Sequence, residues 1–210
     1  MIQHSADSIY AIGDPPDYEP TPDQTVGAIA RARGEDPLAT MYDLMLESSG
    51  TAMLMMPFFN YVEGNHDAIY EMMTHRAAVS GLSDGGAHCG LICDASYPTF
   101  MLTHWARDRR RGQRFPIEYV VRKQTLDTAN LFGLTDRGVL SVGKKADVNV
   151  IDLEALTLSV PRMAYDLPAG GNRLMQGASG YDATVVSGIV TRRHGADTGA
   201  RPGKVLRGVR

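Results

Sequence analysis

A short apolar stretch without charge, residues 79–83, ends at an aspartate near the middle of the chain. Such a stretch is typical of a strand that is buried on both faces, as in a parallel sheet. A carboxylate at the end of such a strand, here Asp84, is costly to bury unless a metal, hydrogen bonds or a cation compensates its charge. The pattern therefore predicts a strand that carries Asp84 at its tip. The residue types leave a second reading open, in which Asp84 only accepts backbone N–H bonds in a sharp loop.

The residues around Asp84 extend this candidate site. Gly85 and Gly86 allow tight backbone geometry and the close approach of another group. His88 follows them, and it could contact a substrate, orient Asp84 or serve only the structure of the loop. Asn60 follows the preceding apolar segment and is expected at the same face of the sheet, where polar loop groups could line a pocket.

The order of helix and strand signals predicts parallel pairing. Helices are indicated at residues 22–33, which start with the capping-box pair Thr21 and Gln24, and at 37–48, capped by Asp36. An apolar strand at 51–59, a helix after Asn65 and the strand before Asp84 come next. A strand–helix–strand order favours parallel strands joined by a helical crossover. Two more helices are predicted at 98–110 and 116–132.

Two segments are predicted to be at the surface. Residues 1–20 are acidic and rich in proline, which indicates an irregular loop. The arginines within residues 107–111 are offset by Asp108 and indicate a solvated helix end. Because their apolar side chains recur at helical spacing, Leu38, Met41, Tyr42 and Met45 are expected to be the buried residues of the helix at 37–48.

The chain changes character near Leu134. Short β-type runs follow at 148–152, 184–186 and 189–191, and Ser187-Gly188 joins the last two as a two-residue hairpin. We therefore divide the chain into an α/β segment, residues 1–134, and a β segment with a loose tail, residues 135–210.

Composition excludes several classes of function. The net charge of −3 and the pI near 6 argue against nucleic acid or an anionic membrane as a partner. No apolar run approaches the roughly 20 residues of a membrane span, and the N-terminus lacks a signal-peptide pattern. A cytoplasmic location is expected, in which Cys89 and Cys93 are free thiols.

Several ordered motifs carry a resemblance to a known family. They are GLSDGGAHCG at 81–90, DASYPT at 94–99, His104-Trp105, GKKAD at 143–147, DLPAGG at 166–171 and TGARPG at 198–203. In this order they resemble the C-terminal portion of the N-acyl-D-amino-acid deacylases, which are D-aminoacylase-like members of the amidohydrolase superfamily. The resemblance covers nearly the whole chain.

The resemblance implies a fold, an activity and a cofactor. Residues 1–134 would be the C-terminal segment of a (β/α)₈ TIM barrel, and residues 135–210 would be strands of a small β-sandwich. The activity would be metal-dependent hydrolysis of linear amide C–N bonds in small N-acyl-D-amino acids, with zinc as the cofactor. Asp84 matches the family's general base and acid and could also contact the metal. Gly85, Gly86, His88 and Asn60 are expected to contact the substrate or to support Asp84.

The remaining metal ligands are not recognisable in this sequence. No His-x-His pair occurs, His66 and His75 are expected at the two ends of one helix, and His104 is expected to be packed or at the surface. The chain is therefore expected to be a C-terminal fragment whose other ligands lie elsewhere, either in a missing N-terminal half or in a homo-oligomer.

Three alternatives stay open at this point. The chain could be a non-catalytic or complementing fragment that is inactive alone. It could be a small zinc module that uses His88, Cys89 and Cys93. It could also belong to a hydantoinase-like hydrolase of cyclic amides, since the substrate-binding loops of earlier strands are not in this sequence.

Overall fold

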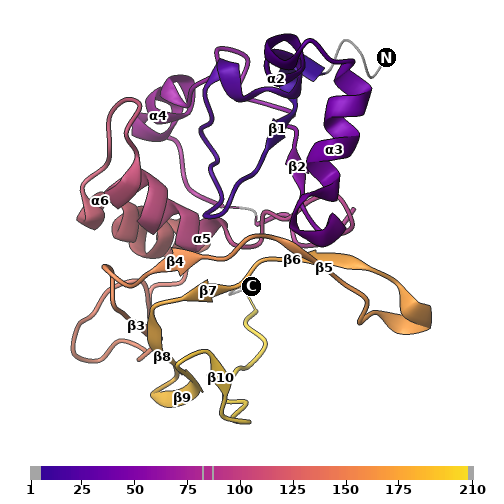
Figure 1. The fold of residues 1–210 in the computed structure, drawn as a ribbon. Coiled ribbons are helices and arrows are strands. Elements are labelled where there is room, and N and C mark those ends of the chain that lie inside the picture. Colours follow the sequence, from indigo (N-terminus) through magenta and orange to yellow (C-terminus); the bar gives the residue numbers. More distant parts are fainter. Residues whose placement is uncertain (1–5, 82, 87, 208–210) are drawn as a thin grey trace.

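The computed structural model describes residues 6–81, 83–86 and 88–207, in which helices come first and strands follow (Figure 1). The helical elements are α2 (Val26–Arg33), α3 (Pro37–Gly50), α4 (Asp67–Thr74), α5 (Tyr97–Phe100), α6 (Ile117–Arg122) and α7 (Thr128–Leu131). Three 3₁₀ turns, η1 (Ala6–Ser8), η2 (Pro22–Gln24) and η5 (Pro168–Gly170), and two π-helical turns, η3 (Met101–Asp108) and η4 (Lys123–Asp127), accompany them.

The strands form one four-stranded sheet and three two-stranded pairs. They are β1 (Tyr10–Ala11), β2 (Leu54–Met55), β3 (Val148–Ile151), β4 (Thr157–Leu158), β5 (Arg162–Ala164), β6 (Arg173–Met175), β7 (Ala178–Ser179), β8 (Tyr181–Val186), β9 (Ile189–Arg193) and β10 (Ala196–Asp197). The larger sheet has the order β10-β9-β8-β3, and β1 pairs with β2, β4 with β7 and β5 with β6. The β5–β6 pair projects from the side of the molecule (Figure 1).

The predicted helix starts are confirmed. The Gln24 side chain accepts a hydrogen bond from the Thr21 backbone N–H at 2.6 Å, as in a capping box. The Asp36 carboxylate accepts from the first backbone N–H groups of α3. The Asn65 side chain likewise accepts from the Asp67 N–H at 2.9 Å, although His66 occupies the N-cap position of α4.

The buried face predicted for α3 is wrong for three of its four residues. Leu38, Tyr42 and Met45 are 44%, 59% and 41% exposed, whereas Leu44 and Thr40 are buried. Leu44 packs in a small core with Ala6 and Val26, and the fourth predicted residue, Met41, packs against this core. The helix therefore faces α2 and η1, which sequence periodicity alone does not identify.

The parallel strand pairing is also wrong for the described residues. The strand expected at 51–59 is reduced to β2, and it pairs antiparallel with β1 in the register Tyr10↔Met55. Described residues of the 79–84 stretch belong to no strand. Side chains, in place of a neighbouring strand, donate to backbone carbonyls in and just before this stretch. Lys123 Nζ donates to the Ala78 carbonyl, and Thr128 Oγ1 donates to the Ser80 carbonyl at 3.2 Å. The structure is thus mixed helix and sheet, and a closed barrel is not present in the part that is described.

Within residues 6–20, the prediction of a surface loop is only partly right. Asp14, Pro15 and Asp17 are exposed, but Ala6, Tyr10, Ile12, Glu19 and Pro20 are buried. The Tyr61 hydroxyl donates to the Pro20 carbonyl at 2.6 Å, and the Tyr10 and Tyr61 rings meet edge to face. This segment therefore contributes to the interior of the N-terminal half.

The C-terminal hairpin is confirmed. β8 and β9 pair antiparallel, and Val186 lies opposite Ile189 across the two-residue loop. Ser187 and Gly188 have φ values of 53° and 79°, as a type I′ turn requires.

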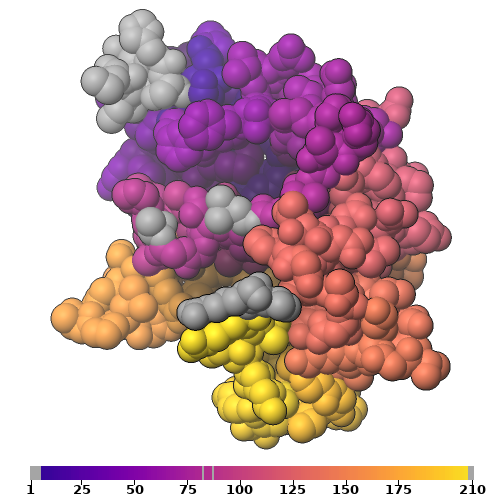
Figure 2. Space-filling view, turned by 180° about the vertical axis from the view of Figure 1, so that it is seen from behind, coloured from indigo at the N-terminus to yellow at the C-terminus, as the bar shows by residue number. Residues whose placement is uncertain are grey.

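The helical and β-rich parts share one core. Trp105, Phe115 and Val120 from the helical part pack with Leu156, which follows β3. Figure 2 shows the helical residues, coloured indigo to magenta, above the orange and yellow strands. The boundary near Leu134 remains a prediction. Among the described helices, none is both long and apolar enough to cross a bilayer.

Gly180→Ala is expected to lower the free energy of unfolding by about 2 kcal/mol or more. Gly180 has a φ of 95°, and an added Cβ would lie 2.6 Å from the Leu156 Cα. Because that atom belongs to the backbone of a fully buried residue, no side-chain rotation relieves the overlap. Urea unfolding measures the change. Gly203→Ala is the control, since an added Cβ there meets nothing within 4 Å; equal effects of the two substitutions would contradict the prediction.

Candidate functional site

Asp84 lies on a loop that the β-rich part and the helical part hold together. The loop turns back after His88, whose carbonyl accepts from the Leu91 and Ile92 N–H groups at 2.8 and 2.9 Å. The Leu174 N–H, from β6, donates to the Cys89 carbonyl at 2.6 Å. A contact between Cys89 and Leu174, about 85 positions later in the sequence, therefore helps to fix the position of this loop.

Three of the residues predicted for the site share an unusual backbone conformation. Asn60, Asp84 and His88 have φ values of 62°, 34° and 54°. Side chains other than glycine rarely adopt positive φ, and such conformations concentrate at functional sites and in turns. Asp84 is half-buried, whereas Asn60 and His88 are exposed.

At the two glycines of the predicted site, neither the backbone conformation nor the surrounding space requires a residue without a side chain. Neither Gly85 nor Gly86 is among the described residues with positive φ. A Cβ added to Gly85 would make an ordinary 3.5 Å contact with Ala95, and one added to Gly86 would meet nothing within 4 Å. Their proposed closeness to a bound group stays a prediction.

A second carboxylate, Asp94, accompanies Asp84. Burial raises the pKa of Asp94, and the neighbouring Asp84 charge raises it further. Burial, together with the Asp94 charge, also raises the pKa of the Cys93 thiol. A nearby negative charge favours the protonated form of a carboxyl group, and this is the effect of Asp84 on Asp94.

The zinc module considered from the sequence, with His88, Cys89 and Cys93 as ligands, does not form in the described chain. Cys89 and Cys93 are free cysteines, as predicted. The Cys89 thiol lies against the Asn172 carbonyl at 3.9 Å, and His88 is exposed. Within residues 6–81, 83–86 and 88–207, the grouping of three or more potential ligands lies elsewhere, at Glu19, His66 and His104.

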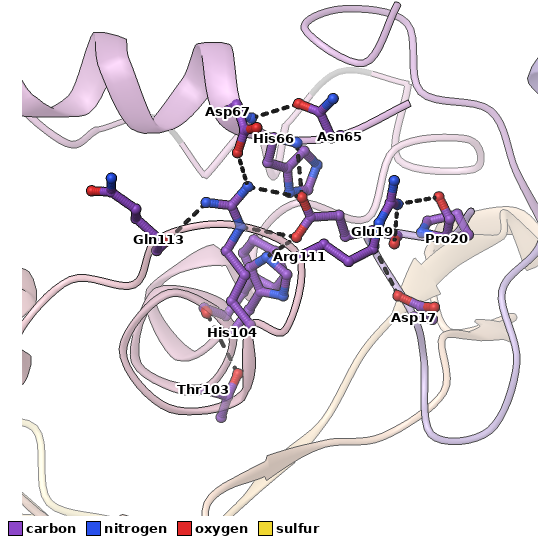
Figure 3. Close-up of polar contacts among 12 residues, drawn as sticks. Asp17, Glu19, Pro20, Asn65, His66, Asp67, Thr103, His104, Arg111 and Gln113 are labelled. Carbon is purple, nitrogen blue, oxygen red and sulfur yellow. Dashed lines mark hydrogen bonds and ion pairs between the residues drawn. The ribbon is translucent and has the colours of Figure 1, made fainter. Parts of the chain in front are cut away.

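Glu19 and Arg109 form a buried ion pair at this second location (Figure 3). Their side chains are only 4% and 0% exposed. Arg109 Nε donates to Glu19 Oε2 at 3.0 Å, and Arg109 Nη2 donates to Oε1 at 2.9 Å. The pairing is therefore bidentate, which is the strongest arrangement for these two groups.

Further contacts complete the ion pair. The His66 backbone N–H donates to Glu19 Oε1 at 2.8 Å. Arg109 also donates to Asp67 Oδ1 at 2.7 Å and to the Gln113 carbonyl at 2.7 Å, and its guanidinium lies 4.7 Å from the centre of the Trp105 ring. Burial acts to raise the pKa of Glu19, but the hydrogen bonds from Arg109 and His66 outweigh it and lower the pKa below its usual value.

Two imidazoles adjoin the Glu19 carboxylate. His104 Nε2 lies 3.2 Å from Glu19 Oε2, but this approach lacks the direction of a hydrogen bond. His66 Nδ1 and His104 Nε2 are buried and have no hydrogen-bond partner among the described residues. Burial, with His66 nearby, lowers the pKa of His104 to about 4, and burial also lowers the pKa of His66. Both rings are therefore neutral at pH 7.

The structure thus separates two kinds of chemistry. The loop of Asp84 carries the carboxyl group of Asp84 near that of Asp94, and in the described chain no group of three potential metal ligands includes them. Glu19, His66 and His104 offer one oxygen and two neutral nitrogens, all within 4.8 Å of one another, which could hold a metal ion. A cavity of about 860 Å³ borders Glu19, His104 and Arg109.

A sequence model described as the amidohydrolase family matches residues 10–192. The chain belongs to the amidohydrolase family. Over 98 residues it is 33% identical to an N-acyl-D-glutamate deacylase from Alcaligenes xylosoxydans xylosoxydans, which is 47% of this chain and 18% of that protein. The matched part therefore spans less than a fifth of that relative's length. No solved structure matches this chain.

Sequence reasoning on this amidohydrolase chain missed Glu19, Arg109 and the two histidines beside them. Glu19 was placed in a surface loop and Arg109 at a solvated helix end, whereas both are buried. His66 was expected to be a helix-end residue, which it is, but it also faces Glu19. One signal in the sequence could have indicated this pairing: residues 14–19 are acidic and residues 107–111, about 90 positions later, are mostly arginine.

Glu19→Gln is expected to destabilise the chain by about 3–5 kcal/mol, because it removes the buried partner of Arg109 and leaves only the exposed Asp67 carboxylate to pair with it. The double variant Glu19→Gln with Arg109→Met should lose less free energy of unfolding than the sum of the losses in the two single variants, since both charges are then removed together. Urea unfolding of the single and double variants measures both effects. Asp197→Asn, which removes the exposed pair with Arg201, should leave stability unchanged. Additive single effects would show that the two groups do not interact.

Acidification from pH 6.5 toward pH 4 is expected to lower the melting temperature when metal is chelated. In the unfolded chain His104 takes up a proton near pH 6.5, whereas in the folded chain it does so only near pH 4. The unfolded state therefore binds more protons in this window, and stability falls as the pH falls. Thermal melts across this range should show a shallower slope for His104→Gln and an unchanged slope for His75→Gln. If the melting temperature depended on pH with the same slope in the unmodified chain, His104→Gln and His75→Gln, the pH dependence could not be assigned to His104.

Proposed function

We propose that this chain contributes the general base and acid to the hydrolysis of a linear amide bond in N-acyl-D-amino acids. Membership of the amidohydrolase family supports hydrolysis in general. The partial similarity to a protein named N-acyl-D-glutamate deacylase supports the finer choice of substrate. The protein that contains this chain is thus proposed to act on small acylated amino acids.

The observation that carries the proposal is the position of Asp84. It is half-buried on a loop with a positive φ of 34°, and its charge raises the pKa of the adjacent Asp94. A carboxyl group with a perturbed pKa, such as Asp94, is common at catalytic sites. The family resemblance assigns proton transfer to the same residue.

The proposed chemistry uses Asp84 twice. As a carboxylate it accepts a proton from the attacking water, so that the water oxygen bonds to the amide carbon. It then donates this proton to the departing nitrogen as the C–N bond breaks. The products are a carboxylic acid and a free amino acid. Asp94, whose pKa is raised, would assist by holding the proton in place of Asp84 during part of the reaction.

Zinc is the proposed cofactor of the reaction. When bound, it would acidify the attacking water and stabilise the negative charge on the carbonyl oxygen. At the Asp84 loop, the described chain offers the carboxyl groups of Asp84 and Asp94 but no group of three potential metal ligands. The fit at that position is therefore incomplete, and we derive no step through the metal there.

The missing ligands are proposed to come from another segment, either further N-terminal polypeptide or a second copy of the chain. Large apolar side chains are exposed around the predicted site: Phe59 is 84% exposed, Val62 is 99% and Leu91 is 80%. Large apolar side chains that are this exposed are candidates for a surface that another segment covers.

Asp84→Asn is expected to lower kcat/KM for N-acetyl-D-glutamate by about 10² to 10⁴-fold in the active protein that contains this chain, because a general base and acid is lost. Its melting temperature should stay unchanged. Asp43→Asn, at an exposed carboxylate on α3, is the matched control. Release of the free amino acid measures the reaction.

Two outcomes would contradict different parts of this proposal. Near-normal turnover by Asp84→Asn would exclude Asp84 as the base. Turnover of a hydantoin or an L-enantiomer in preference to N-acetyl-D-glutamate, with the same dependence on Asp84, would keep the base and overturn the substrate.

A further inference from the structure

We infer that Glu19, His66 and His104 form a binding site for a divalent cation of the zinc class, separate from Asp84. The inference does not rest on the proposed function, because it concerns a different group of residues and a binding event. The three residues come from distant parts of the sequence: the segment after β1, the N-cap of α4 and the π-helical turn η3.

The first argument is unsatisfied hydrogen-bonding capacity. His66 is only 8% exposed, yet its Nδ1 has no partner in the described chain, and the same holds for the buried Nε2 of His104. A buried polar atom without a partner is costly, and such atoms are rare in folded proteins. One cation placed between the two rings would satisfy both nitrogen lone pairs at once.

The second argument is the donor set. One ligand atom from each of the three side chains lies within 4.8 Å of the others, so modest side-chain movement brings all three to a common ion. Two imidazole nitrogens and a carboxylate oxygen are a frequent zinc set, whereas calcium and magnesium prefer oxygen alone.

Arg109 affects the proposed cation site in two opposite ways: its positive charge weakens cation binding, and its hydrogen bonds orient the Glu19 carboxylate. Its guanidinium already holds both oxygens of Glu19, and a nearby cation weakens the binding of another. Each carboxylate oxygen has two lone pairs, however, and Oε2 accepts from Arg109 Nε alone. A ligating carboxylate is commonly oriented by a hydrogen bond from a neighbouring side chain, and Arg109 has that position. Asp67 and the Trp105 ring share the charge of the guanidinium.

The cavity beside the site leaves room for a further ligand. Glu19 and His104 both line this space of about 860 Å³. Three protein ligands with one position open to solvent are typical of zinc sites that keep a bound water, in contrast to closed structural sites with four protein ligands. Figure 3 shows Glu19, His66 and His104 gathered at one place.

The test is zinc binding by the purified chain after removal of metal with EDTA. Equilibrium dialysis should give about one zinc per chain, and both His66→Gln and His104→Gln should weaken binding by more than about tenfold, the loss that even outer-sphere substitutions cause. His75→Gln, at the exposed far end of α4, should bind as the unmodified chain does. Zinc should also raise the melting temperature of the unmodified chain, and magnesium should not.

Two further variants separate this inference from other zinc sites. Asp84→Asn should keep the zinc, since it changes only the residue of the proposed function. Cys89→Ser with Cys93→Ser should keep it as well. Zinc that is lost in either of these variants, or no stoichiometric zinc at all, would overturn the inference.

If His66→Gln does not fold, cobalt substitution in the unmodified chain decides the question. Cobalt held by nitrogen and oxygen gives visible d–d bands without a sulfur-to-metal charge-transfer band. A strong charge-transfer band would place the ion on Cys89 and Cys93 and would overturn the inference.

Discussion

The buried ion pair between Glu19 and Arg109 is the interaction on which the helical half depends. Removing both charges from water costs several kcal/mol per ion, so hydrogen bonds must compensate for the lost hydration. The His66 backbone N–H donates to Glu19 Oε1, and the Asp67 carboxylate and the Gln113 carbonyl accept from Arg109. Because these partners lie on the segment after β1, the start of α4 and the loop after η3, one pair fixes the relative positions of three segments.

Local features of the fold could be predicted because their partners lie within a few residues. The caps at Thr21 and Asp36 and the hairpin at Ser187-Gly188 belong to this class. The parallel sheet and the buried face of α3 could not be predicted, because each depends on a partner distant in sequence. An apolar stretch such as 79–83 fits a buried strand, yet here Lys123 and Thr128 satisfy its neighbouring carbonyls in place of a sheet.

The same distinction applies to the candidate site. Asp84 could be found because its motif is contiguous, and a contiguous motif survives any error in the surrounding fold. Asp94 and the Glu19 group depend on spatial neighbours, so their perturbed pKa values have no signature in the sequence. The Asp84 loop itself is positioned from afar, since β6 donates to the Cys89 carbonyl.

Tyr18 connects the two groups of titratable residues. It precedes Glu19 in the chain, and its ring meets Phe100 at 5.2 Å, while Phe100 stacks on His104 at 4.7 Å. Burial raises the pKa of Tyr18 to about 12. The Gln176 side chain donates to the Tyr18 hydroxyl at 2.6 Å and accepts from the Ser96 hydroxyl, two residues after Asp94. Ring contacts therefore connect Tyr18 to His104, and hydrogen bonds connect Tyr18 to the segment that follows Asp94. Any shift of the segment that holds Glu19 must move Tyr18, and with it this hydrogen-bonded connection to the segment of Asp94.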